Sequence, residues 1–330
     1  MLAFILRRLL QSIAVLLTVG FVAFSLFRYV GDPINAMVGQ DTTMEQRDEL
    51  RTKLGLNDSP PIQFARFIYN ASRGNFGLSY RTSEPVGRLI LERVPATLEL
   101  SFCAALFALF VGVPMGVYTG LYPNHWSSRL FQAVSLIGIS LPTFLIGILL
   151  ILVFAVSLHW LPSFGRGETV QIGWWTTNFL TVSGLKALIL PSITLGLFQL
   201  TLIMRLVRSE MLEVMRTDYI KFARARGLAN RVINFGHALK NTLVPVITVA
   251  GLQLGALIAF AIVTETVFAW PGVGQLFIQS VQFSDIPVMA AYLLLIGLLF
   301  VLINLVVDLL YFAVDPRLRA EGGGARVAGH

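Results

Sequence analysis

Long apolar runs separated by polar segments dominate the chain. Six runs reach the roughly 20 residues that an α-helix needs to cross the hydrocarbon layer of a membrane. They are Leu9–Val30, Thr97–Gly120, Leu130–Leu158, Leu188–Val207, Leu243–Val267 and Val288–Val314. The pattern therefore predicts an all-α integral membrane protein with six transmembrane helices, and an even number of crossings places both termini on one side.

The first apolar run is interpreted as a retained membrane anchor, because it is longer than the apolar core of a secretory signal. No small-residue cleavage site follows it before Phe27, Arg28 and Tyr29. Residues 1–30 are accordingly assigned to an N-terminal segment and the first transmembrane helix.

The connection between the first two spans, residues 31–96, is too long to be a structureless loop, since such loops beyond about 12 to 15 residues are uncommon. Thr42 and Glu45 have the spacing of a capping box, which predicts a helix over Met44–Leu54. This connection is expected to form a small helical cap on the extracytoplasmic side.

Two further helices are predicted in the cap. One begins at Pro61 and ends at Gly74, and a third short helix begins at Pro85 before Pro95 turns the chain into the second span. The apolar face of the helix after Pro61 consists of Phe64, Phe67 and Ile68.

Composition and charge support a membrane location. Hydrophobic residues make up 55% and charged residues 13%, against roughly one quarter charged in a soluble domain. The net charge of +7 comes mostly from basic residues beside the apolar spans, where Lys and Arg set orientation, and this distribution argues against nucleic-acid binding. The positive-inside rule makes three regions cytoplasmic: Arg7–Arg8, the connection 208–242, and Arg317 with Arg319.

The cytoplasmic connection 208–242 contains a predicted helix that Thr217 or Asp218 caps and Gly227 ends. It is expected to present an apolar knob formed by Tyr219, Phe222 and Ala223, flanked by Lys221 and Arg224. A rigid helix between two membrane spans is suited to transmitting force. The alternative is a solvated basic loop that binds anionic lipid headgroups.

Two acidic residues lie within or near apolar spans, where an ionised side chain costs about 2.5 to 3.5 kcal/mol on insertion scales. Asp308 in the sixth span has either a hydrogen-bonded structural role or a contact with substrate. Glu265 lies beside the turn Trp270-Pro271-Gly272 and either organises an outer gate or caps a helix.

Pro142 and Pro191 each remove a backbone hydrogen bond within an apolar span. Either proline is a flexing point of the span or an ordinary proline kink.

Signatures of catalysis are missing from the sequence. There is no G-x-x-x-x-G-K-[ST] phosphate loop, and the single cysteine, Cys103, lies in an apolar run. The histidines are scattered without ligand spacing at His125, His159, His237 and His330. We therefore expect a chain that is not an enzyme and binds no metal or cofactor itself, with an intramembrane enzyme as an alternative.

Motifs along nearly the whole chain resemble those of one family. They are Leu54-Gly55-Leu56, Gly74-Asn75-Phe76-Gly77, Pro85-Val86, the stretch Glu92–Leu100, Ser140–Phe144, Leu161-Pro162, the loop segment Tyr219–Pro245, Glu265–Phe268, Trp270–Gly274 and Asp315-Pro316-Arg317. With these motifs the chain resembles the permease subunits of type I ATP-binding-cassette (ABC) importers, specifically the B-type subunit of dipeptide and oligopeptide permeases.

The resemblance implies that Tyr219–Gly227 is a coupling helix that docks into a groove on a separate ATPase subunit. The general importer pattern Glu-Ala-Ala-x-x-x-Gly is matched only at Ala223 and Gly227, because Lys221 and Phe222 occupy the first two positions. The resemblance therefore does not imply a salt-bridging role for Lys221, which occupies the first position of this pattern.

The resemblance also implies the rest of the machine. A second permease would complete the path, two cytoplasmic ATPase subunits would hold ATP and magnesium, and an extracytoplasmic binding protein would deliver solute at the bacterial inner membrane. Residues 97–316 would form the permease core, followed by a disordered cytoplasmic tail at 317–330.

Two alternatives belong to other classes of protein. A proton-coupled secondary peptide transporter would need titrating groups along the path and usually internal repeats, whereas few embedded acids and no evident repeat are present. A purely structural membrane scaffold would leave uptake unchanged when deleted. The substrate itself, whether dipeptide, longer peptide, glutathione or a nickel complex, does not follow from the sequence.

Overall fold

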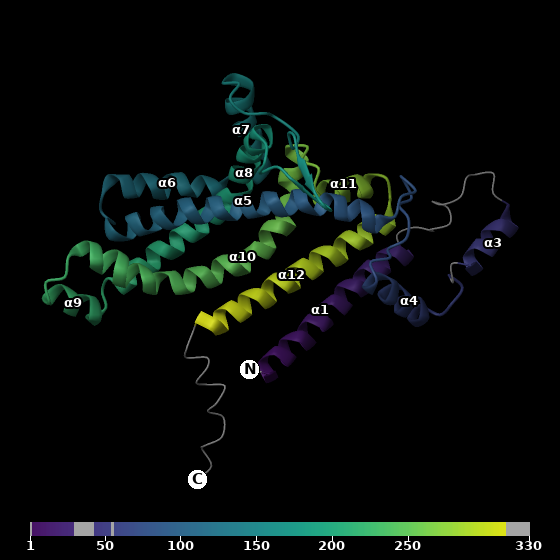
Figure 1. The fold of residues 1–330 in the computed structure, drawn as a ribbon, viewed down its shortest axis with the longest axis horizontal. Helices are drawn as coiled ribbons and strands as arrows, with labels where there is room; N and C mark the ends of the chain where they lie inside the picture. The colour runs from purple at the N-terminus through teal and green to yellow at the C-terminus, as the bar shows by residue number, and fades with distance from the viewer. Residues whose placement is uncertain (1, 30–42, 54–55, 315–330) are drawn as a thin grey trace, which may run out of the picture. The chain divides into compact units, whose positions relative to one another are not determined.

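The computed structural model describes residues 2–29, 43–53 and 56–314 of the 330-residue chain, and its described part is almost entirely helical (Figure 1). The helices are α1 (Leu2–Tyr29), α3 (Met44–Lys53), α4 (Pro60–Ser72), α5 (Val86–Leu121), α6 (Trp126–Ser140), α7 (Thr143–Leu150), α8 (Val182–Val214), α9 (Asp218–Ala225), α10 (Leu239–Val267), α11 (Val273–Gln282) and α12 (Ile286–Val314). Two π-helical segments are η1 (Ile151–Ser157) and η2 (Val232–Ala238), and the strands β1 (Val170–Ile172) and β2 (Trp175–Thr177) form a hairpin. The predicted tail at 317–330 lies outside the described residues.

Five helices within the described ranges are long and apolar enough to cross a membrane, and a bent pair supplies a sixth candidate. The five lie at Leu6–Leu26, Val86–Leu121, Val182–Val214, Pro245–Val267 and Ile286–Val307. The predicted fold class is thereby confirmed, although the third span is not one helix.

The third span is broken at Pro142. Helix α6 and the continuous α7–η1 segment meet at an angle of 112°. Leu141, which precedes the proline, has ψ 139°, and Pro142 has ψ 137°, so both are extended. Proline disfavours the helical region for its predecessor, which explains why the helix stops here, whereas the sequence predicted a continuous span.

Pro95 does the opposite of what the sequence predicts. The expected short helix at Pro85 and the second span form one helix, α5, of 36 residues that runs through Pro95. A proline inside a helix removes one hydrogen bond, but its φ suits the helix. Val94, Ala96 and Leu100 are all buried around it, so packing holds the two parts together.

The chain divides into two compact units, and the first contains residues 1–97, 171–176 and 271–302. In this unit α4 packs along α1 through the aromatic face that the sequence predicted. The Phe64 ring lies 5.5 Å from that of Phe24 and 5.9 Å from that of Phe21, and Phe67 lies 6.0 Å from Phe24. Gly20 leaves room for Ile68, since a Cβ there would lie 2.6 Å from the Ile68 Cδ1 atom.

Helix α3 begins at the predicted Met44, but its capping pair lies one residue later than the predicted Thr42 and Glu45. The reciprocal capping bonds join Thr43 and Gln46: the Gln46 N–H donates to Thr43 Oγ1 at 3.4 Å, and the Thr43 N–H donates to Gln46 Oε1 at 3.2 Å. Thr42, the predicted cap, lies outside the described residues.

The second unit contains, of the described residues, 98–170, 177–270 and 303–314, and α5 and α8 approach each other closely in it. Three glycines at four-residue spacing on α5, Gly112, Gly116 and Gly120, face α8. A Cβ at Gly116 would lie 2.7 Å from the Met204 carbonyl oxygen, so the two backbones approach closely. Small residues at this spacing are a common basis for helix association in membranes.

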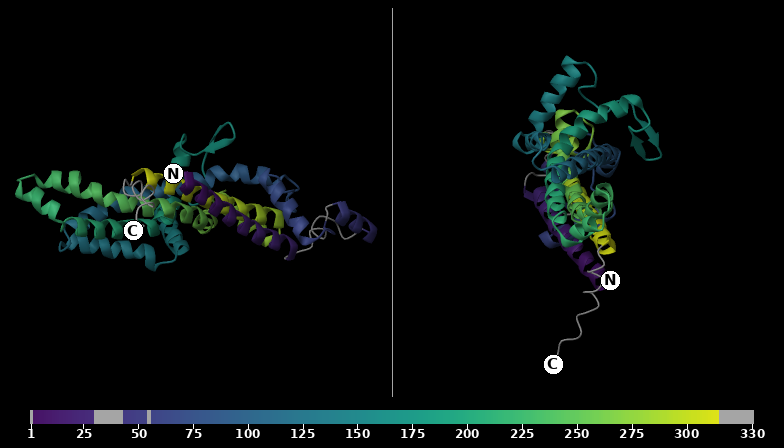
Figure 2. Two further views of the ribbon diagram at one scale, coloured as in Figure 1. Left: turned by 90° about the horizontal axis from the view of Figure 1, so that it is seen from below. Right: turned by 90° about the vertical axis from the view of Figure 1, so that its left-hand side faces the viewer.

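Helices α6, α7 and α10 also pack against α8 within this unit (Figure 1). In the views of Figures 1 and 2, α9 lies at the end of α8 that is remote from α7. The second unit therefore has α9 at one end of α8 and residues 177–181, which lead into α8, at the other.

Candidate functional site

The predicted helix in the cytoplasmic connection is present as α9, which begins at Asp218 and ends at Ala225. Thr217 has the extended backbone of an N-cap, but its hydroxyl donates to the Val214 carbonyl at 2.6 Å and does not cap the helix. Asp218 lies in the first turn, where its carboxylate accepts from Lys221 at 2.9 Å. Gly227 follows with φ +74°, the left-handed conformation in which glycine commonly ends helices.

One face of α9 is buried against its own chain. Ile220 is 0% exposed and Ala223 is 8% exposed. Both belong to a buried apolar cluster that also contains Val207 and Met211 of α8, Val117 of α5, and Ile233 and Ala238 of η2. The prediction that Ala223 forms part of an exposed knob is therefore wrong; its small side chain faces inward and lets α9 lie close to η2.

The opposite face of α9 exposes aromatic side chains. Phe222 is 63% exposed, with the Arg226 guanidinium 5.5 Å from its ring centre, and Tyr219 is also exposed. Three further exposed apolar residues follow in sequence: Leu228, Val232 and Phe235. These residues lie outside the candidate membrane spans, between Val214 and Pro245, so their exposed apolar groups mark a candidate interaction surface. The sequence prediction missed these last three, although they interrupt an otherwise polar segment.

A hydrogen bond ties α9 to α10. The Asn241 Nδ2 group donates to the Tyr219 hydroxyl at 2.7 Å. Between them lies η2, a seven-residue π-helical segment that no sequence signal predicted. Such segments are rare and occur frequently at functional sites. Helix α9 is thus fixed to α8 by buried apolar contacts and to α10 by a hydrogen bond.

The predicted gate residues at the far end of α10 are buried. Glu265 and Trp270 are both fully buried, and the Trp270 N–H donates to the Glu265 carbonyl oxygen at 2.8 Å. Pro271 is half-buried. Asp308 falls within α12, but its side chain is outside the described residues. Glu265 and Trp270 are therefore packed inside the protein, and the gate or pathway role of these residues stays a prediction.

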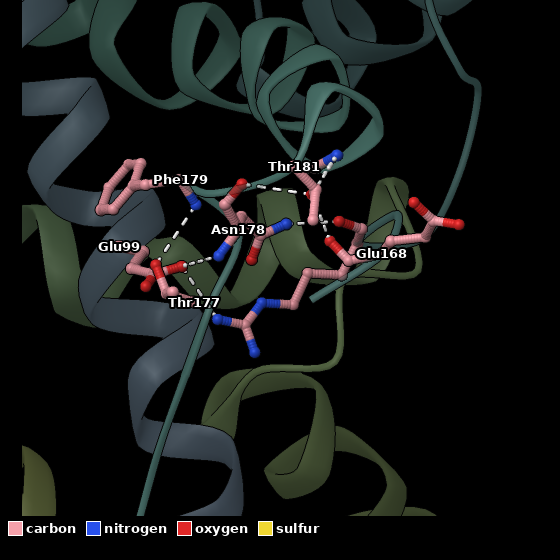
Figure 3. A network of polar contacts seen from close by, with 8 residues as sticks. Glu99, Glu168, Thr177, Asn178, Phe179 and Thr181 are labelled. Carbon is pink, nitrogen blue, oxygen red and sulfur yellow. Dashed lines mark hydrogen bonds and ion pairs between the residues drawn. The ribbon is translucent and has the colours of Figure 1, made fainter. Parts of the chain in front are cut away.

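A buried polar cluster that the sequence analysis missed lies where the chain enters α8 (Figure 3). The Glu99 carboxylate on α5 accepts from Arg166 Nη2 at 2.9 Å and from the Asn178 N–H at 3.1 Å. The side chains of Glu99 and Arg166 are only 2% and 8% exposed. Burial lowers the pKa of the Arg166 guanidinium, and the hydrogen bond to Glu99 partly opposes that shift.

Asn178 and Thr181 extend the cluster to the start of α8. The Asn178 side-chain amide donates to the Arg166 carbonyl oxygen. The Thr181 hydroxyl donates to the Glu168 carbonyl at 2.6 Å and accepts from the Gly184 N–H at 3.0 Å, which caps α8 (Figure 3). A lone arginine in an aromatic segment and a glutamate at the start of an apolar run were the available sequence signals.

Family models match the chain along most of its length. The model described as binding-protein-dependent transport system inner membrane component matches residues 112–320. A second model, for the N-terminal part of such membrane components, matches residues 1–101.

Curated relatives match over their full lengths. The chain is 40% identical over 335 residues to the di/tripeptide transport system permease protein DppB of Pseudomonas aeruginosa, covering 97% of this chain and 100% of the relative. It is 38% identical over 332 residues to the dipeptide transport system permease protein DppB of Alkalihalophilus pseudofirmus, with the same coverage. It is 37% identical over 320 residues to the glutathione transport system permease protein GsiC of Escherichia coli, covering 97% and 99%.

Among solved structures, a chain of the MetNI methionine ABC transporter in an inward-facing conformation has a similar fold. The TM-score is 0.55 at 23% identity, over 69% of this chain and 96% of that one. At this identity the likeness concerns the fold alone.

Proposed function

Because the chain belongs to the family of binding-protein-dependent transport system inner membrane components, we propose that it carries short peptides across the bacterial inner membrane. It is a multi-pass permease subunit of an ABC importer and not an enzyme. This membership favours the importer over the secondary-transporter alternative. The full-length similarity to permeases named for dipeptides, di/tripeptides and glutathione supports amide-linked solutes of two or three residues as the substrate class.

The position of α9 is the observation that carries the coupling part of the proposal. An importer must transmit the closure of its ATPase subunits to the membrane helices. Helix α9 offers exposed Phe222 and Tyr219 to a partner, while Ile220 and Ala223 anchor it to its own chain. We assign docking on the ATPase to Tyr219, Lys221, Phe222 and Arg224, and the shape of the helix end to Gly227.

The orientation follows from the same assignment. If α9 contacts a cytoplasmic ATPase, both termini are cytoplasmic and residues 31–96 face the outside. A second permease would complete the path, and two ATPase subunits would supply ATP and magnesium. When the ATPase subunits close on ATP, they would carry α9 inward. The contacts of α9 with α8 and α10 would then move those two spans with it. This movement would open the path outward to solute from the binding protein.

A helix-breaking substitution tests the coupling assignment. Gly227→Pro cannot adopt the positive φ of +74°, because the proline ring fixes φ near −65°. In cells that lack their own copy of this permease, the variant should insert into the membrane normally but support no uptake of a radiolabelled dipeptide. Gly227→Asn, which tolerates the left-handed conformation, is the matched variant and should retain most uptake.

Normal dipeptide uptake by Gly227→Pro would refute the coupling role of α9. The substrate class is tested separately by competition. Unlabelled dipeptide, tripeptide and glutathione are each added in excess to cells that carry the parent chain. The proposed substrate class is wrong if none of them reduces uptake of the radiolabelled dipeptide.

A further inference from the structure

We propose that Glu99 and Arg166, an ion pair that the coupling site does not use, are positioning residues. They carry movement of α9 to the extracytoplasmic end of the subunit. They do so by joining α5 to the entry loop, defined as residues 163–169 and 177–181 on either side of the hairpin. This inference rests on the proposed coupling role of α9.

Glu99 holds both parts of the entry loop with one carboxylate. Arg166 reaches it from the part before the hairpin and the Asn178 N–H from the part after it, at 2.9 and 3.1 Å. Asn178 also donates its side-chain amide to the Arg166 carbonyl oxygen, so the two parts are bonded to each other as well. One carboxylate of α5 therefore contacts both parts of the entry loop.

The same loop is fixed to α8 and to the end of α10. Thr181 caps α8 through the Gly184 N–H while donating to Glu168, and the Ser183 hydroxyl donates to the Glu168 carboxylate at 3.2 Å. The Gly165 N–H donates to the carbonyl oxygen of Phe268, just after α10, at 2.9 Å. The three helices α5, α8 and α10 thus meet at the entry loop.

Stabilisation of the fold alone does not explain why Glu99 and Arg166 form a buried ion pair. Removing two charges from water costs about as much as their attraction returns, so apolar residues of similar volume often stabilise a protein as well or better. A buried ion pair is best accounted for where it specifies one geometry. Here it specifies the position of the entry loop on α5.

The opposite end of α5 and α8 contacts the coupling element. Val117 of α5 and Met211 of α8 lie in the same buried cluster as Ile220 of α9. From Glu99 to Val117 a helix rises about 27 Å, which is close to the thickness of the hydrocarbon layer. Gly112 and Gly116 between these positions, and Gly120 just after Val117, hold α5 close against α8, so the two helices move as one body.

Loss of the ion pair is expected to uncouple transport from ATP hydrolysis. In the double variant Glu99→Gln, Arg166→Met neither charge is left buried alone, so the subunit should still fold. ATP hydrolysis should persist because α9 and its cluster are intact, while transport should fail because the entry loop no longer follows α5.

The experiment uses the complete importer in proteoliposomes, with labelled dipeptide as substrate. We expect the double variant to hydrolyse ATP within about twofold of the parent rate, while dipeptide transported per ATP falls about tenfold, in the range of coupling between distant sites. Arg166→Lys keeps the charge but loses the forked geometry, and it should give an intermediate ratio.

An exposed ion pair on the same helix is the matched control. Arg88 Nε lies 2.9 Å from Glu92 Oε1, the same distance as in the buried pair, but the side chains are 72% and 56% exposed. The double variant Arg88→Met, Glu92→Gln should keep the parental ratio of transport to hydrolysis. A loss of that ratio in this control would show that any charge change on α5 uncouples the importer, and would overturn the inference.

Two other outcomes also overturn it. If hydrolysis and transport fall together in the Glu99→Gln, Arg166→Met variant, the pair only maintains the fold. If the ratio stays at the parental value while Gly227→Pro still abolishes uptake, the coupling role of α9 stands and only the positioning role of the pair fails. Normal uptake by Gly227→Pro would instead refute the coupling role of α9, on which this inference rests.

Discussion

Two neighbouring residues of α9 should separate folding of the subunit from docking of its partner. Ile220 is fully buried against α8, and Phe222, two residues later, is 63% exposed. Ile220→Ala removes three carbon atoms, worth about 2.4 kcal/mol at about 0.8 kcal/mol for each buried methylene. The cavity left behind raises the total to about 2 to 5 kcal/mol.

The loss at Ile220 should appear as local opening of α9. A helix of eight residues is not stable alone, because isolated helices shorter than about 12 to 15 residues are marginal in water. Its order therefore depends on the contacts of Ile220 and Ala223. Phe222→Ala touches neither contact and should cost the subunit at most about 1 kcal/mol, including its cation–π contact with Arg226.

Hydrogen–deuterium exchange of the purified chain in detergent measures this opening directly. Amides of residues 218–225 should exchange faster in Ile220→Ala by a factor of about 30 or more, and only slightly faster in Phe222→Ala. Co-purification of the ATPase subunit measures docking. An exposed aromatic anchor is typically worth about 2 kcal/mol or more, so Phe222→Ala should weaken ATPase binding about 30-fold.

Equal exchange in the two variants would refute the assignment of faces on α9. So would an Ile220→Ala chain whose α9 amides remain as protected as those of the parent. If Phe222→Ala binds the ATPase with parental affinity, the exposed face of α9 is not the docking surface.

Two further predictions concern packing away from α9. Gly116→Leu should lower the thermal unfolding temperature of the chain in detergent, because its Cβ would lie 2.7 Å from the Met204 carbonyl oxygen and force α5 and α8 apart at a cost of about 1 to 3 kcal/mol. Asp285→Ala should destabilise the first unit by about 1 to 3 kcal/mol, because it leaves the Ser79 hydroxyl and the Tyr80 N–H without their buried acceptor. Faster limited proteolysis at residues 79–82 would report this loss, and an unchanged cleavage rate would contradict it.

Features that depend on local sequence were predictable. The bounds of α9 followed from Thr217 and Gly227, since a capping position and a left-handed glycine act within one helical turn. The aromatic face of α4 followed from the helical spacing of Phe64 and Phe67. Membrane spans followed from length and hydropathy alone, because the hydrocarbon layer imposes both.

Features that depend on tertiary packing were not predictable. The pattern of α9 contains two candidate apolar faces, and only the position of α8 and η2 decides that Ala223 faces inward. Prolines behave according to their surroundings: buried neighbours hold α5 together at Pro95, whereas α6 and α7 separate at Pro142. The Glu99–Arg166 pair joins residues 67 positions apart, and no periodicity specifies a pairing at that distance.

The buried and exposed faces of α9 together fit the coupling role that we propose for it. A docking helix bound only to its partner would move with the ATPase and leave the membrane spans behind. A helix buried on all sides would offer the partner no contact. Ile220 and Ala223 give α9 a permanent attachment to α8, and Asn241 gives it a second attachment to α10, while Phe222 remains free for the partner. Because α9 packs in one cluster with α8 and is hydrogen-bonded to α10, the proposed displacement of α9 would act on both spans at once.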